Sequence, residues 1–231
     1  MKITSDLYKN LLAQSAKQEL IIEIAGVEYG ESNIISCSTS GGLFQGLSIG
    51  NASSRQIDLQ IIPLENIPRQ AQINVYVMLT DGVLASERLP CGVFFISQRS
   101  TDRSTGVMTI VGFDAMLKSE DTWLNSDYDE ESWPMDVNYA LLDIATRMGV
   151  EIDGRTVLNS AFPVHYPVDV VGDITMREVL QRIAVANAGN WCITDEGKLL
   201  LVPLTSAPID TNYLITENGD TILFGDVRIL I

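Results

Sequence analysis

The sequence contains few of the residues that usually catalyse reactions or bind metals. It has a single histidine, His165, and three distant cysteines, Cys37, Cys91 and Cys192, without a CxxC pair. One histidine rules out an HExxH metal site, and this cysteine spacing indicates neither a zinc knuckle nor a disulfide framework. His165 lies between prolines in a loop-like stretch, with no GxSxG or cysteine motif to complete a triad. We therefore expect three buried thiols in a reducing cytosol, no enzyme activity, and no catalytic, cofactor-binding or metal-binding residue.

Basic residues and long apolar runs are also scarce. Lys and Arg number 15 against 30 Asp and Glu, which gives a net charge of −15, although the apolar fraction of 46% is ordinary for a globular protein. Such a surface repels nucleic acid and anionic membranes, or it simply keeps the protein soluble. No stretch reaches the ~18 apolar residues of a membrane span, and the N-terminus lacks the apolar core of a signal peptide. We expect folding in a cytoplasm.

Alternating apolar residues dominate the first half of the chain. In QINVYVML, Ile73, Val75, Val77 and Leu79 fall on one face of a strand. A helix capped by Ser5 precedes the strands, with its apolar face made by Leu7, Tyr8, Leu11 and Leu12. Further strands are predicted within 19–32, 33–40, 55–63, 91–100 and 105–113. This spacing predicts an antiparallel barrel or sandwich, and we assign residues 1–113 to a β-barrel-like domain.

Helical periodicity replaces the alternation after residue 113. A short helical piece follows first, and then Pro134 opens a longer helix that Gly149 ends. Thr175 and Glu178 form a capping box for a second helix, with Gly189 as its stop. NWCIT and KLLLVP predict a hairpin around 195–197, so we assign 114–204 to an α+β domain. The tail, 205–231, returns to strands with an Asn-Gly turn at 218–219, and these strands either rejoin the first domain or begin another.

Three further patterns in the sequence are candidates for functional sites. The glycine-rich stretch from Gly41 through Gly46 continues with Leu-Ser, whereas a phosphate loop continues with Lys and Ser/Thr, so a bulge or close backbone approach is the better interpretation. An acidic run lacks the spacing of an EF-hand and is typical of a solvated loop, although a carboxylate pair for glycoside hydrolysis stays open. The run comprises Asp127, Asp129, Glu130 and Glu131. Trp123 and Trp133 are expected to pack the helices against the barrel.

The order of these elements resembles the baseplate hub family of phage and prophage tail proteins. Its pattern of Gly-x-Phe, a polar turn, a strand ending in an aromatic-Asp pair and a helix is similar to Gly92-Val93-Phe94, Phe113-Asp114 and the residues that follow. A second family pattern, a Thr-x-Arg-(Glu/Asp)-Val-Leu helix, a Gly-Asn strand and an Asp-x-Gly-Lys-Leu hairpin, is matched further along. The matching residues are Thr175, Arg177, Glu178, Val179, Leu180, Gly189, Asn190, Asp195, Gly197, Lys198 and Leu199.

The resemblance implies a structural role in a phage tail. Hub proteins of this kind form a trimeric ring of barrel domains that joins the tail tube or a distal tail protein to a spike or tip protein. An acidic lumen would let DNA pass without specific nucleic-acid binding, and the net charge of −15 is compatible with that; no stable membrane insertion is implied. The chain would assemble in the bacterial cytoplasm and then reside in the virion tail. Hub proteins carry a second tube-type domain, so this sequence is expected to be either a chain whose tail completes the first barrel or a fragment.

Two other function classes remain as alternatives. A tail-associated cell-wall hydrolase would use acids such as Asp127 or Glu130. A carbohydrate- or receptor-binding β module would need an exposed aromatic platform, for which Trp123, Tyr128 and Trp133 are the clustered candidates. The first alternative predicts muralytic activity that alanine exchange in the acidic loop abolishes, and the second predicts glycan binding.

Overall fold

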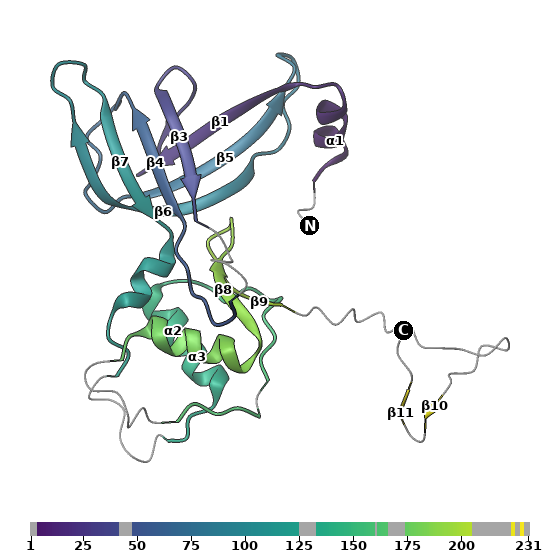
Figure 1. Cartoon of the computed structure of the whole chain (residues 1–231). Helices are drawn as coiled ribbons and strands as arrows, with labels where there is room; N and C mark the ends of the chain where they lie inside the picture. The colour runs from purple at the N-terminus through teal and green to yellow at the C-terminus, as the bar shows by residue number, and fades with distance from the viewer. Residues whose placement is uncertain are drawn as a thin grey trace.

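The structure is a computed structural model that describes residues 4–41, 48–124, 133–159, 161–165 and 174–204, together with the backbone of 223–224 and 227–228. Seven strands form one antiparallel sheet in the order β2-β1-β5-β6-β7-β4-β3, and the sheet curls into a half-barrel (Figure 1). Their bounds are β1 Lys17–Ile24, β2 Val27–Tyr29, β3 Ile34–Ser40, β4 Gln56–Ile61, β5 Gln72–Thr80, β6 Leu89–Thr101 and β7 Met108–Phe113. The predicted α+β class with an antiparallel, barrel-like sheet is confirmed.

The concave side of the sheet holds the first hydrophobic core. On β5 the predicted alternation places Ile73, Val75 and Leu79 in the interior, each at most 3% exposed, while Val77 is half-buried. Cross-strand partners are buried with them, for example Ile22 opposite Val75. Period-two side-chain direction therefore explains why these strands bury one face and leave the other accessible.

The remaining elements form a helical unit, by which we mean η1, α2, α3 and the β8–β9 hairpin. Their bounds are η1 Ala115–Glu120, α2 Val137–Met148, α3 Met176–Ala186, β8 Gly189–Ile193 and β9 Leu199–Pro203. A second core joins both α-helices to the hairpin around Trp123 and Trp191, which are completely buried. The Trp191 indole N–H donates to the Leu180 carbonyl at 2.7 Å, so its one polar atom is satisfied in the core.

Two predicted helix limits are wrong and one is confirmed. The α2 helix begins at Val137 because the Asp136 carboxylate caps it, and Pro134 lies outside the helix. Gly149 ends α2 as predicted, in a left-handed conformation with φ of 68°. The α3 helix ends at Ala186, and Gly189 already belongs to β8. The capping box of Thr175 and Glu178 at the start of α3 is present.

The N-terminal helix α1 (Asp6–Ala13) is fastened by its cap. Ser5 caps it as predicted, and Ser5 N–H also donates to a Glu87 carboxylate oxygen at 2.7 Å. Only Leu11 is buried, whereas Leu7 and Leu12 of the predicted apolar face are 37% and 59% exposed. The polar contact to Glu87 thus anchors α1 to the connection between β5 and β6, and the helix adds little apolar burial.

The C-terminal strands β10 (Leu223–Phe224) and β11 (Val227–Arg228) pair with each other. In the described residues they join neither the seven-stranded sheet nor the β8–β9 hairpin. The predicted turn at 218–219 lies outside the described residues. Over the described ranges, the model has no helix whose length and hydropathy would allow it to cross a membrane.

Candidate functional site at the junction of the sheet and the helical unit

The structure describes four of the candidate reactive residues, His165 and the three cysteines. His165 is exposed. The preceding residue, Val164, exchanges two backbone hydrogen bonds with Met135, both at 2.8 Å. The three cysteines are half-buried rather than fully buried. Burial raises the pKa of the Cys37 thiol and raises that of Cys192 to about 11, so both are protonated at neutral pH and are poor nucleophiles. Within the ranges given above, no group of three or more His, Cys, Asp or Glu could hold a metal ion.

The structure tests the glycine-rich stretch and the tryptophan pair only in part, and it does not describe the acidic run. The acidic run at 127–131, Tyr128 included, and Gly46 lie outside the described residues. At Gly41 a Cβ would lie 2.8 Å from the Ser54 carbonyl oxygen, which confirms a close backbone approach. Trp123 is 0% exposed and Trp133 packs edge-on against it, with ring centroids 5.6 Å apart. Both belong to the core of the helical unit and not to a packing layer on the sheet, and Trp123 cannot form part of an exposed platform.

Polar side chains converge at the junction between the sheet and the helical unit. Arg55, directly before β4, donates from Nη1 to Asp195 Oδ1 at 2.7 Å and from Nη2 to the Thr194 carbonyl at 3.4 Å. Its guanidinium carbon lies 5.5 Å from the centroid of the Phe94 ring on β6. One side chain therefore links the end of the half-barrel to the β8–β9 turn, by charge on one side and by a cation–π contact on the other.

Asp114 lies at the same junction, where β7 passes into η1. Its carboxylate accepts from Arg55 N–H at 2.9 Å and from Met116 N–H at 3.1 Å, and Asp114 N–H donates to the Arg55 carbonyl at 3.0 Å. The Asp114 side chain is completely buried, and Arg55 Nε lies 3.7 Å from it. Burial raises the pKa of Asp114 to about 6, against the opposing effects of these backbone donors, Arg55 and Arg177.

Arg177, on the first turn of α3, joins the same region from the other side. Its Nη2 donates to Ser54 Oγ at 3.0 Å and to the Met116 carbonyl at 3.1 Å, while Nε lies 3.1 Å from Glu120 Oε1. These contacts tie α3 to both η1 and the segment that enters β4. Arg177 therefore extends the junction to a second helix through the donors on its Nε and Nη2.

Segments from elsewhere in the chain cover both edges of the β8–β9 hairpin. Along β8, Gly50 N–H donates to the Gly189 carbonyl at 2.9 Å, and Trp191 N–H donates to the Asn51 carbonyl at 2.8 Å. Along β9, Leu199 exchanges backbone hydrogen bonds with residues 151 and 153, both 2.8 Å. The hairpin thus has strand-like neighbours on both sides, which fixes the position of its turn against Arg55.

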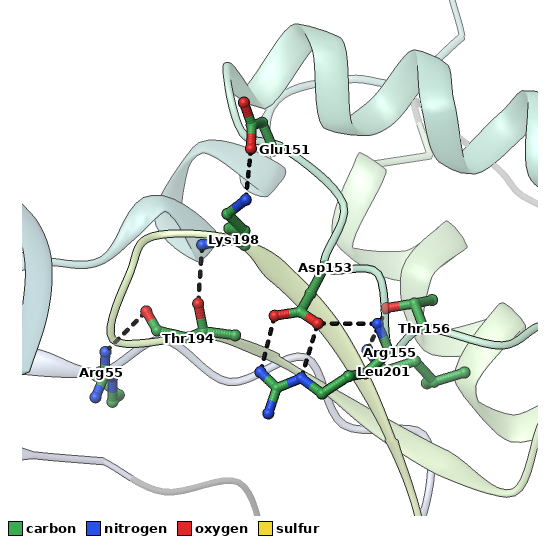
Figure 2. Close-up of polar contacts among 8 residues, drawn as sticks. All are labelled: Arg55, Glu151, Asp153, Arg155, Thr156, Thr194, Lys198 and Leu201. Atoms are coloured by element: carbon green, nitrogen blue, oxygen red, sulfur yellow. Dashed lines mark hydrogen bonds and ion pairs between the residues drawn. The ribbon is translucent and has the colours of Figure 1, made fainter. Parts of the chain in front are cut away.

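Figure 2 shows two ion pairs of segment 151–156, one within the segment and one between the segment and the hairpin. Asp153 accepts from Arg155 Nε and Nη2, both at 2.8 Å, and Glu151 accepts from Lys198 Nζ at 2.7 Å. The Glu151 and Lys198 side chains are 78% and 43% exposed, so solvent screens this pair. We infer that these pairs orient the segment more than they stabilise the fold.

Two concavities flank the junction. A groove of about 820 Å³ runs along the hairpin and is lined on one side by Cys192, and a cleft of about 320 Å³ lies between Val93 of β6 and Gly197 of the turn. The cations that line the groove, Arg155 and Lys198, are each held by a carboxylate. The contacts of this region therefore join the sheet to the hairpin and the helical unit.

The family-like residues meet at this junction. Asp114, Arg177 and Asp195, which the resemblance picked out at three distant points, all lie within the contact network of residues 54 and 55. Sequence reasoning missed Arg55 itself because its partners are 59 and 140 residues away along the chain. The signal that could have found it is an arginine at the start of a predicted strand, combined with Asp114 and Asp195, two aspartates of the family-like patterns that had no assigned role.

Comparison with known proteins gives likeness at the level of fold. No protein-family model matches the sequence, and no curated protein matches it. Among solved structures, the 43 kDa tail protein of prophage MuSo2 from Shewanella oneidensis has a TM-score of 0.53 and 13% identity, covering 82% of this chain and 56% of that protein. The tail protein from Neisseria meningitidis MC58 has a TM-score of 0.51 and 14% identity, covering 80% and 51%. The chain therefore spans just over half the length of these two proteins.

Proposed function

We propose that this chain is a structural component of a phage or prophage tail, within the baseplate hub, where it connects the tail tube to the spike or tip protein. The observation that carries the proposal is the shared fold with two tail proteins, one of them from a prophage, over four-fifths of the chain. The junction supports it, because a subunit that transmits position between neighbours needs its two parts held in one orientation. The chain would act as a spacer of defined shape.

The charge of the chain supports the conduit part of this proposal. With a net charge of −15, an inner surface formed by several copies would repel DNA and let it pass without binding. In this proposal three copies form a ring and place their half-barrels around the conduit. The partners are then the tail tube or a distal tail protein on one side and the spike or tip protein on the other.

Deleting the gene tests the tail function directly. In the genome that encodes this chain, particles induced without it should lack tails or carry tails without a tip in negative-stain images, and the wild-type gene should restore them. Cross-linking within purified particles should join this chain to tube and spike proteins. Normal, infectious tails without the chain would contradict the proposal. Muralytic activity of the purified chain that is lost on alanine exchange at Asp127 and Glu130 would favour the hydrolase instead.

A further inference from the structure

Five basic side chains in the described ranges form no ion pair, and three of them lie on or beside β6. The five are Arg69, Arg99, Arg103, Lys118 and Arg182. Arg99 is near the end of β6 and Arg103 is in the turn that follows; Figure 1 shows this β6–β7 turn at the end of the sheet away from the helical unit. Arg69 is two residues before Ala71, whose carbonyl accepts from Ile96 N–H of β6 at 3.1 Å. We call Arg69, Arg99 and Arg103 the β6 arginines.

The other two basic side chains have neighbours within the chain. Lys118 Nζ lies 3.9 Å from the centroid of the Phe95 ring. Arg182 follows Glu178 by four residues on α3, a spacing at which opposite charges attract along a helix. Arg99 differs from both, because its Nη1 is buried and has no hydrogen-bond partner among the described residues. A buried donor without an acceptor is costly, so an acceptor from outside the chain would stabilise it.

The outer face of β1 and β2 carries an excess of the opposite charge. Ile22 and Ile24 of β1 belong to the first core, so the alternation of side chains turns Glu23 to the outer face. Glu23 lies directly opposite Glu28 of β2, and like charges in this position repel each other. One cation, Arg88, serves both carboxylates: it forms a bidentate ion pair with Glu28, and Glu23 acts on it through charge alone. This face therefore lacks a positive charge, as the β6 arginines lack a negative one.

We propose that the β6 arginines of one copy contact the outer face of β1 and β2 in the next copy, where Glu23 and Glu28 accept from the guanidinium groups. The contact is head-to-tail, so every subunit of a closed ring of three copies can make it once on each side. A second copy is the occupant because two chains of net charge −15 repel each other over most of their surface, and these two faces are complementary in charge. The contact rests on the ring of copies in the proposed function and assigns residues to it.

The first test reverses the charge on each face and then on both. Arg99→Glu/Arg103→Glu places carboxylates against carboxylates in the contact. Glu19→Arg/Glu23→Arg places arginines against arginines, since alternation sets both positions on the outer face of β1. In sedimentation velocity from about 1 to several hundred micromolar, each double variant should associate at least about tenfold more weakly than wild type. A chain with all four substitutions restores opposite charges and should form the wild-type oligomer.

A control matched in charge changes residues away from both faces. Arg182→Glu/Lys198→Glu alters the net charge by the same amount as the arginine variant, but both positions belong to the helical unit, so association should equal that of wild type. Because Arg99 is half-buried, its replacement can unfold the chain, which circular dichroism would reveal. In that case Arg103→Glu, alone and combined with Glu23→Arg, repeats the comparison with exposed Arg103.

Cross-linking identifies the neighbours of the turn directly. Arg103→Lys keeps the charge and supplies a primary amine, which a carbodiimide condenses with a nearby carboxylate to an amide while the reagent takes up the lost water as a urea. Isotopically labelled and unlabelled copies are mixed, cross-linked, digested and analysed by mass spectrometry. Peptide pairs that combine one labelled and one unlabelled copy should join position 103 to Glu23 or Glu28.

Four results would overturn this contact. They are a wild-type chain that stays monomeric throughout the concentration range, an arginine variant that folds and associates as wild type does, a fourfold variant that stays as weak as the double variants, and binding of a fluorescent DNA duplex that depends on Arg99 and Arg103. The last result would assign the arginines to phosphate groups instead. The gene-deletion experiment above tests the tail function in particles, so its failure is distinguishable from failure of this contact in the purified chain.

Discussion

Protonation of Asp114 is expected to stabilise the folded chain between about pH 7 and pH 5. The Asp114 side chain is completely buried, and its pKa is raised from 3.8 to about 6, with burial as the largest cause. A carboxyl group whose pKa is higher in the folded than in the unfolded state binds more protons when folded. Stability therefore increases as the pH falls through about 6, and the gain is complete below the unfolded value near 4.

The expected size follows from the pKa difference. A shift of about two units, at 1.36 kcal/mol per unit, makes the ionised state of Asp114 cost about 3 kcal/mol of folding stability relative to the protonated state. Between about pH 7 and pH 5 about 1 kcal/mol of this is recovered. Relief of repulsion among the other acidic groups contributes in the same direction, so the wild-type curve alone does not isolate Asp114.

A comparison with the Asp114→Asn variant isolates the contribution of Asp114 to the pH dependence of stability. Asn keeps an oxygen that can cap η1, so Met116 N–H retains an acceptor, but the side chain no longer titrates. Urea unfolding followed by tryptophan fluorescence at several pH values should show a gain in stability on acidification that is about 1 kcal/mol smaller in this variant. Equal pH dependence of the two proteins between about pH 7 and pH 5 would refute the assignment of the raised pKa to Asp114.

Asp153 provides a control of opposite sign. The Arg155 side chain lowers the pKa of Asp153 to about 2 through a bidentate hydrogen bond. A depressed pKa contributes stability that is present above the unfolded value and is lost as the pH falls from about 4 towards 2. Asp153→Asn should therefore change the stability curve in that lower window and leave the slope between about pH 7 and pH 5 as in wild type.

Three other substitutions test the contacts that define the junction and the helical unit. Arg55→Ala should destabilise the fold by about 2 kcal/mol at pH 7, because it removes the ion pair with Asp195 and leaves the buried Asp114 without its nearest cation, whereas Asp195→Ala, which removes only the partly exposed partner, should cost about 1 kcal/mol in the same urea titration. Thr175→Ala should cost about 1 kcal/mol by removing the cap of α3. Trp191→Phe should cost about 2 kcal/mol by leaving the Leu180 carbonyl without its buried donor, measured by the shift in thermal midpoint.

Local signals explain which elements the sequence predicts correctly. Side-chain alternation on β5 and the capping box at Thr175 depend on residues within one strand or one turn, so the residues themselves contain the information. The predictions of two helix ends are wrong where several local rules compete. Gly189 has the residue type of a helix stop, but Ala188 adopts the left-handed conformation with φ of 47°, and the helix has ended before it. A Cβ at Gly189 would lie 2.8 Å from the Val202 carbonyl oxygen, so its glycine serves the pairing of β8 with β9.

The junction shows what periodicity leaves out. Arg55 and Asp195 are both polar residues at the ends of strands, where a sequence pattern assigns them to solvent. They meet because β4 pairs with β7 and because the two flanking segments fix the position of the hairpin. The resemblance picked out Asp114, Arg177 and Asp195 without a reason for their residue types. Their common neighbour at residues 54 and 55 provides it, since a buried carboxylate and a spread of guanidinium donors each require partners at fixed positions, and such partners hold the half-barrel and the helical unit in one arrangement.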